Sequence, residues 1–182
     1  MIENDRSIRH NAVVDMAHQI MIAARTAPKG KGVDLIEIAL VSQRGDLEVL
    51  ADAMRRRAEE TGMKFLIRDA ENILSGEAVL LIGTRSEPLG LNCAYCGFES
   101  CTLKPSHVPC AINSVDVGIA LGAACSKAAD LRLDTRVMFS AGWCSQMLDW
   151  MPQCHQIIAI AIGAASKNPF FDRKPKEEPQ KQ

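Results

Sequence analysis

Four of the chain's seven cysteines are gathered in one short segment, LNCAYCGFESCTLKPSHVPC, and this feature constrains the fold more than any other. The segment has the spacing C-x2-C-x4-C-x8-C, with its thiols at Cys93, Cys96, Cys101 and Cys110. It carries glycine, prolines and serines and has neither helical nor strand periodicity. Long irregular loops are uncommon inside compact domains unless they have a function of their own. We therefore expect a metal-binding loop over residues 91–112.

The spacing leaves more than one kind of metal centre open. A 4Fe–4S cubane takes four thiolates, several of them commonly from one short loop and one from further along the chain, as in this segment. A structural zinc uses the same four thiolates, but its ligands more often come as two separate C-x2-C pairs. Plant-type 2Fe–2S loops have the longer gap first, the reverse of this order. Four unrelated cysteines so close together would be an implausible coincidence, so the spacing favours iron–sulfur, with zinc as the alternative.

The remaining cysteines, Cys125, Cys144 and Cys154, are expected to be buried thiols that pack as small apolar residues. Cys154 is followed by His155, and a Cys-His pair can activate a nucleophile. No further base or orienting group can be placed beside that pair, so packing is the favoured interpretation.

The amino-acid composition limits the kinds of molecule that the chain is expected to bind. A net charge of −1 and an aromatic content of 4% argue against binding nucleic acid or an anionic membrane surface. No apolar run approaches the roughly 18–20 residues of a membrane-spanning helix. The odd number of cysteines and the polar opening MIENDRSIRH argue against a secreted disulfide framework. We expect a reducing, cytoplasmic location.

Apolar periodicity predicts helices and strands on both sides of the cysteine segment. Helical spacing is found at 13–24, 47–58 and 112–131, and a helix is expected to end at 146–150. Aliphatic and β-branched runs predict strands at 33–41, 64–67, 78–82, 137–139 and 157–162. The alternation predicts a single α/β (α+β) three-layer domain over 1–171 that contains the cysteine loop. A charged tail is expected at 172–182.

Several segments resemble a known family. They are LNCAYCGFESC, DVGIALGAACSKAADLRLDTRVMFSAG and the ending SKNPFFDR. Together they resemble the uncharacterised bacterial and archaeal proteins described as containing a ferredoxin domain, over nearly the whole chain. The resemblance implies a 4Fe–4S cluster on Cys93, Cys96, Cys101 and Cys110.

A second similarity concerns the fold. AARTAP at 23–28, the DVGIALGAACSKAADLRL helix and the ending IIAIAIGAASKNPFFDRKPKEE are similar to the FMN-dependent nitroreductase fold. That resemblance implies a homodimer with flavin sites between its subunits. By motif position, Arg25, Lys29 and Arg173 would hold the FMN phosphate, and ordinary surface charge is the alternative role for Arg25 and Arg173. KGKGVD stands where that fold has a polar Ser/Asn/Gln stretch.

The functional hypothesis is an iron–sulfur protein that passes single electrons, linked to FMN as an oxidoreductase of unspecified substrate. Its expected partners are a redox protein or a small-molecule electron donor or acceptor. The alternatives are a binding module stabilised by zinc or a cluster, and a redox or iron sensor without catalysis. No catalytic residue is assigned, because we find no dinucleotide fingerprint, phosphate loop or Ser-His-Asp arrangement.

Overall fold

A computed structural model describes residues 2–171 of the chain. Its centre is a four-stranded sheet in the order β1-β2-β4-β3, in which every neighbouring pair is antiparallel. The strands are β1 Ile36–Val41, β2 Ala78–Arg85, β3 Asp134–Met138 and β4 Cys154–Gly163. Strands β2 and β4 lie in the middle, which explains why their sequences are apolar at nearly every position.

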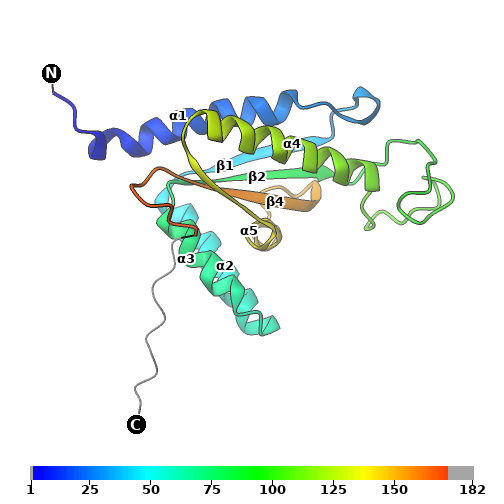
Figure 1. The fold of residues 1–182 in the computed structure, drawn as a ribbon. Coiled ribbons are helices and arrows are strands. Elements are labelled where there is room, and N and C mark those ends of the chain that lie inside the picture. The colour runs from blue at the N-terminus through cyan, green and yellow to red at the C-terminus, as the bar shows by residue number, and fades with distance from the viewer. Residues whose placement is uncertain (1, 172–182) are drawn as a thin grey trace, which may run out of the picture.

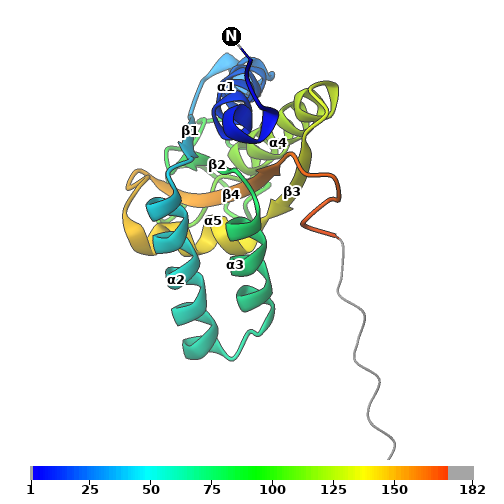
Figure 2. The same ribbon diagram turned by 90° about the vertical axis from the view of Figure 1, so that its left-hand side faces the viewer.

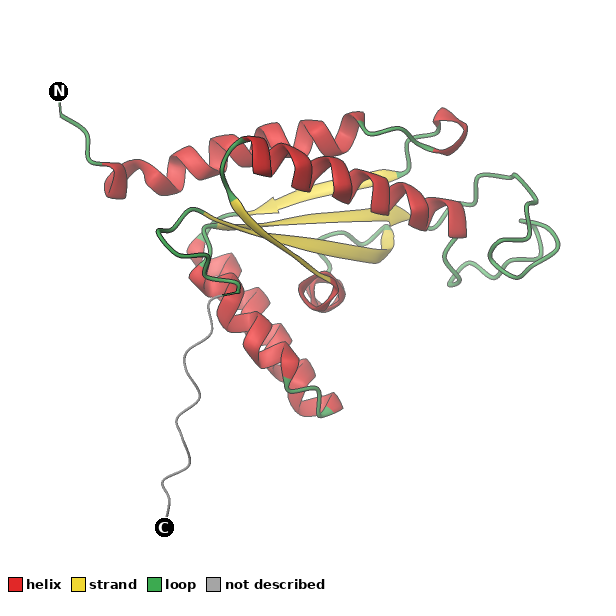
Figure 3. Ribbon diagram, in the orientation of Figure 1, coloured by secondary structure: helices red, strands yellow, loops and turns green. Residues whose placement is uncertain are grey.

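Helices cover both faces of the sheet (Figures 1 and 3). Helices α1 (Asp5–Thr26) and α4 (Ala111–Asp130) lie on one face. Helices α2 (Arg44–Thr61), α3 (Phe65–Ser75) and α5 (Phe139–Ser145) lie on the other, where α2 and α3 form a hairpin that extends beyond the sheet (Figure 2). Two short 3-10 helices, Gly30–Gly32 and Gln146–Leu148, complete the structure of the described residues. The predicted three-layer α+β architecture is confirmed.

Alternate residues of β2 build two separate cores. Val79 and Leu81 pack with α2, α3 and α5, whereas Leu80 and Ile82 pack with α1 and α4. Successive side chains of a strand point to opposite faces, so a fully buried strand supplies both cores. The α1–α4 contact is lined by small buried residues: Ala17, Ala24, Ala120, Ala124 and Ala128.

One predicted strand is wrong. Residues 64–67 begin helix α3, whose buried residues are Leu66, Asp69, Ala70 and Ile73. Their spacing of three, four and seven positions is that of one helix face. The run Phe65–Ile67 is too short to show that period by itself. The helix expected to end at 146–150 ends earlier, at Ser145, and continues as a 3-10 turn to Leu148.

The other predicted elements are found with small shifts at their ends. The strand expected at 33–41 begins at Ile36, and most of its residues are half-buried because β1 is an edge strand. Gly62 ends α2 in the left-handed conformation, with φ of 73°. The 25 residues between β2 and α4, all of them described, form neither helix nor strand and extend from one end of the sheet (Figure 1). The tail expected at 172–182 lies outside the described residues.

Candidate metal centre and its surroundings

The four cysteines of the predicted metal loop line one small pocket at the N-terminal end of α4. Cys93 is exposed, Cys96 and Cys101 are half-buried, and Cys110 is buried. Among residues 2–171, no three His, Cys, Asp or Glu side chains are grouped tightly enough to hold a single metal ion. The four thiols therefore share a pocket without meeting at one point.

The backbone of the loop turns sharply around these thiols. In a turn over residues 94–97, the N–H of Gly97 donates to the carbonyl of Ala94, with φ of 87° at Gly97 and 60° at Ala94. Glycine suits position 97 because, without a Cβ atom, it adopts a positive φ at no steric cost. The turn brings the first two thiols to the same pocket.

Asn92 connects the start of the cysteine loop to its third cysteine, a role that we did not predict from the sequence. Its side-chain oxygen accepts the backbone N–H of Cys101 at 2.8 Å. Its own backbone N–H donates to the Cys101 sulfur at 3.4 Å. Asn92 has a φ of 48°, a conformation that asparagine tolerates better than most residues. An asparagine directly before the first cysteine was the available signal.

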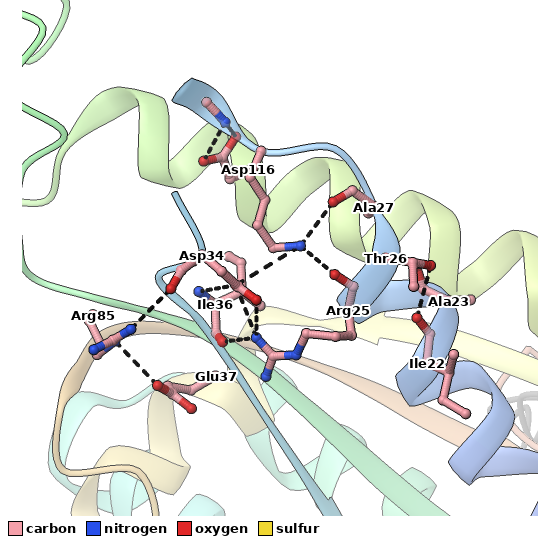
Figure 4. Close-up of polar contacts among 12 residues, drawn as sticks. Ile22, Ala23, Arg25, Thr26, Ala27, Asp34, Ile36, Glu37, Arg85 and Asp116 are labelled. Carbon is pink, nitrogen blue, oxygen red and sulfur yellow. Dashed lines mark hydrogen bonds and ion pairs between the residues drawn. The ribbon is translucent and has the colours of Figure 1, made fainter. Parts of the chain in front are cut away.

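The base of the loop is fixed to α4 by the segment KGKGVD. Both carboxylate oxygens of Asp116, on α4, accept the backbone N–H of Gly30, at 3.0 and 3.1 Å (Figure 4). Lys31 donates to the carbonyl of Leu89, and the amide of Asn113 donates to the carbonyl of Glu87. The segment that departs from the nitroreductase pattern thus holds the cysteine loop in place.

The first turn of α4 faces the pocket. Cys110 is the N-cap of this 20-residue helix, and Ala111 and Ile112 line the pocket with the thiols. The N-terminal turn of a helix has backbone N–H groups without helical partners and carries a partial positive charge. This end of α4 therefore favours a negatively charged group in the pocket.

Two of the predicted phosphate-binding residues, Arg25 and Lys29, lie together beside Asp34 (Figure 4). The Nη1 atom of Arg25 donates to both Asp34 oxygens at 2.9 Å. Lys29, whose side chain is 7% exposed, donates to the carbonyls of Arg25 and Ala27, at the C-terminal end of α1. A phosphate at these cations would compete with Asp34. Arg173 lies outside the described residues.

The pKa of Asp34 reflects these contacts. Burial alone would raise it, but the hydrogen bond from Arg25, the hydrogen bond from the Ile36 backbone and the charges of Arg25 and Lys29 outweigh burial. The net effect lowers the pKa of the Asp34 carboxyl. The carboxylate is therefore ionised at neutral pH and holds its two cations.

Of the three other cysteines, Cys144 and Cys154 are buried in the core, as predicted, whereas Cys125 is half-buried and packs against the core. Burial raises the pKa of the Cys144 and Cys154 thiols to about 11, and burial also raises that of Cys125. Cys154 is buried whereas His155 is exposed, because neighbouring residues of β4 point to opposite faces. They do not form a Cys-His catalytic pair.

A second pocket, of about 350 Å³, lies where β3 ends and leaves the edge of β4 unpaired. It is lined by Met63, Phe139, Trp143, Gln146, His155, Gln156, Ile157 and Ile158. The rings of Phe139 and Trp143 are stacked, with centroids 6.2 Å apart. The hydroxyl of Ser114 lies 2.7 Å from the side-chain oxygen of Gln156 and 3.2 Å from the carbonyl oxygen of Cys110, and its one proton is shared between these two acceptors. The aromatic pocket is thus linked to the last cysteine of the loop.

Comparison with known proteins supports the resemblance seen in the sequence. The family model described as "Uncharacterized protein containing a ferredoxin domain (DUF2148)" matches residues 106–173. An uncharacterized protein from Archaeoglobus fulgidus is 37% identical over 190 residues, which cover 97% of this chain and 100% of that protein. The chain belongs to this family of ferredoxin-domain proteins. No described helix of this family member is long and apolar enough to cross a membrane.

Solved structures show the fold of this ferredoxin-domain protein. A nitroreductase with bound FMN from Bacteroides fragilis matches 92% of this chain and 86% of its own, with a TM-score of 0.60 and 12% identity. A BluB-like flavoprotein from Clostridium difficile matches 91% of this chain and 85% of its own, with a TM-score of 0.58 and 16% identity. At these identities the likeness shows the fold alone. The predicted nitroreductase-like fold is confirmed.

Proposed function

We propose that this chain is a redox protein that holds a 4Fe–4S cluster on Cys93, Cys96, Cys101 and Cys110. The observation that carries the proposal is the convergence of all four thiols of the motif on one pocket. In a tetrahedral zinc site with Zn–S distances near 2.3 Å, the sulfurs lie about 3.8 Å apart. A cubane instead binds each thiolate to a different iron, so its ligands surround a larger volume. The pocket brings together the ligands that either centre needs, and the spacing of the motif favours the cubane.

The surrounding residues suit an anionic cofactor of this kind. When bound, the cluster supplies one-electron chemistry. Asn92 donates a backbone N–H to the Cys101 sulfur, and the N-terminus of α4 faces the pocket. Hydrogen bonds to ligand sulfurs and solvent exposure both set the potential of such a centre. The exposed Cys93 and Tyr95 leave one side of the loop open for electron exchange with a partner.

A flavin-linked oxidoreductase is the second candidate, favoured by the aromatic pocket beside the loop. Sites for small molecules are commonly apolar, of a few hundred cubic ångströms, with a few polar groups. Stacked Phe139 and Trp143, with the amides of Gln146 and Gln156, suit a planar ring. The similar protein from Bacteroides fragilis has FMN bound. Here Arg25, Lys29 and Arg173 would hold the FMN phosphate. Arg25 and Lys29 would have to give up their ion pairs with Asp34 to bind it.

The wider proposal is a cytoplasmic homodimer that exchanges electrons with a redox protein or a small molecule. A zinc-stabilised binding module and a redox or iron sensor are the alternatives. Zinc would give a colourless protein. A sensor would lose its spectrum in air and regain it with iron and sulfide.

The test is the visible spectrum of protein purified without oxygen, before and after dithionite, in wild type and two matched variants. We expect a broad brown absorbance that bleaches on reduction and returns on reoxidation. Cys96→Ser should abolish it, whereas Cys125→Ser, in a half-buried thiol of α4, should retain it. Equal loss in both variants, or a colourless wild type, would contradict the ligand assignment.

A further inference from the structure

Lys104 is a buried cation inside the cysteine loop. Lys104 is 8% exposed, and its ammonium group donates to the carbonyls of Pro105 at 3.1 Å and Val108 at 2.5 Å. A lysine ammonium has three N–H donors, and in the part of the chain that the structure describes two of them have acceptors. Within residues 2–171, no carboxylate lies within 4.0 Å of this ammonium.

A buried charge without an ion partner is unfavourable. Removing an ion from water costs several kcal/mol in real proteins, and hydrogen bonds to neutral carbonyls offset only part of that cost. Asp69, another buried charged residue, has an ion partner in Arg68, whereas the partners of Lys104 are neutral carbonyls. Lys104 lacks a negative partner in the described part of the chain.

The position of Lys104 indicates what that partner is. Lys104 lines the same pocket as Cys93, Cys96, Cys101 and Cys110. The rest of the lining is apolar apart from Asn92, so Lys104 is the one cationic side chain among the residues described there. Lys104 thus places a buried positive charge in the wall of the pocket that holds four potential thiolates, with its ammonium bonded to carbonyls of the same loop.

We propose that Lys104 is the counter-charge of the anionic metal centre and raises its reduction potential. This inference rests on the proposed function, because it assigns Lys104 a role toward the cluster. A cubane with four thiolates carries net negative charge, and accepting one electron from a one-electron donor adds to it. A fixed positive charge in a weakly polar surrounding stabilises the reduced form more than the oxidised form. Lys104 is a positioning and charge-compensating residue, not a ligand.

The test compares Lys104→Met, Lys104→Arg and a control, Lys127→Met, in the cluster-loaded protein. Lys127 lies on the last turn of α4, about 26 Å along the helix axis from Cys110, so its charge is screened. The midpoint potential is measured by titration with dithionite under a spectroscopic readout. We expect Lys104→Met to shift the redox equilibrium about tenfold toward the oxidised form, which is about 59 mV for one electron. Lys104→Arg and Lys127→Met should keep potentials close to that of the wild type.

A second measurement separates charge compensation from simple loop packing. In the metal-free protein, Lys104→Met removes an uncompensated buried charge, so its melting temperature should equal or exceed that of the wild type. If Lys104 served only to hold the Pro105 and Val108 carbonyls, Lys104→Met would melt lower and leave the potential unchanged. That combination would overturn the proposal.

If Lys104→Met does not retain iron, the rate of iron loss to a chelator is compared in Lys104→Gln and Lys104→Arg. Faster loss from the glutamine variant alone supports the counter-charge, and equal loss from both contradicts it. A wild type that holds zinc and no sulfide refutes the proposed function itself. A wild type with iron and sulfide whose potential is matched by Lys104→Met refutes only the role of Lys104.

Discussion

The carboxylate of Asp116 on α4 accepts the backbone N–H of Gly30 across 86 residues of chain. Asp116→Ala leaves that N–H without its partner in a part-buried position. An unsatisfied buried donor costs about 1–3 kcal/mol, so we expect the free energy of unfolding in urea to fall by that amount. Asp130→Ala, in an exposed carboxylate at the other end of α4, is the control and should change stability by less than about 0.5 kcal/mol. Equal effects of the two variants would show that the Gly30 contact does not stabilise the fold.

Gly142 allows α5 to pack directly against β4. A Cβ atom at this position would lie 2.2 Å from the carbonyl oxygen of Ile157, and backbone cannot move aside as a side chain can. We therefore expect Gly142→Ala to lower the free energy of unfolding by about 3 kcal/mol or more, or to prevent folding. Gly45→Ala is the matched control, because no atom lies within 4 Å of its added Cβ and alanine favours the α2 helix. A Gly142→Ala protein as stable as Gly45→Ala would contradict this packing.

Much of this architecture could be predicted from the sequence, for local reasons. The runs 78–82 and 157–162 are apolar on both faces because β2 and β4 supply two cores, and 112–131 has a helical period over many residues. The run 64–67 was misleading because three apolar residues fit either period. The spacing of the four cysteines predicted that they would lie together, as they do in one pocket, whereas the residues around them could not be predicted. The contact between Gly30 and Asp116 joins distant segments, and the importance of Lys104 lies in its burial. No local sequence pattern shows either feature.

The buried thiols predict how alkylation and stability depend on pH. The pKa of the Cys144 and Cys154 thiols is raised from 9.0 to about 11, so both stay protonated at pH 8. In the metal-free protein, iodoacetamide at pH 8 should modify the exposed Cys93 and spare these two, because the thiolate is the reactive form. Peptide mass mapping measures this order. Early modification of Cys144 or Cys154 in folded protein would contradict their burial.

The raised pKa values of Cys144 and Cys154 also predict how the stability of the fold depends on pH. Between about pH 9 and pH 11, the folded chain keeps protons that the unfolded chain has lost. The contribution of these two thiols to stability is therefore complete below pH 9 and is lost as the pH rises toward 11. Urea unfolding in this range should show a decline that is smaller in Cys144→Ala than in wild type. An identical decline in both proteins would contradict the assignment to this thiol.

Tryptophan fluorescence tests whether the aromatic pocket binds a flavin. Trp143 lines that pocket, and Trp150 lies elsewhere, beside β1. If FMN binds there, titration with FMN should quench the fluorescence of Trp150→Phe, which retains Trp143, more strongly than that of Trp143→Phe. Saturable quenching in the micromolar range would support a flavin site. Equal quenching of both variants would contradict binding in this pocket.

The metal content of protein purified without oxygen tests the central claim most directly. Iron, acid-labile sulfide and zinc are measured per chain on the same sample. We expect about four iron and four sulfide per chain and less than stoichiometric zinc, as a 4Fe–4S cluster requires. One zinc per chain with neither iron nor sulfide would contradict it.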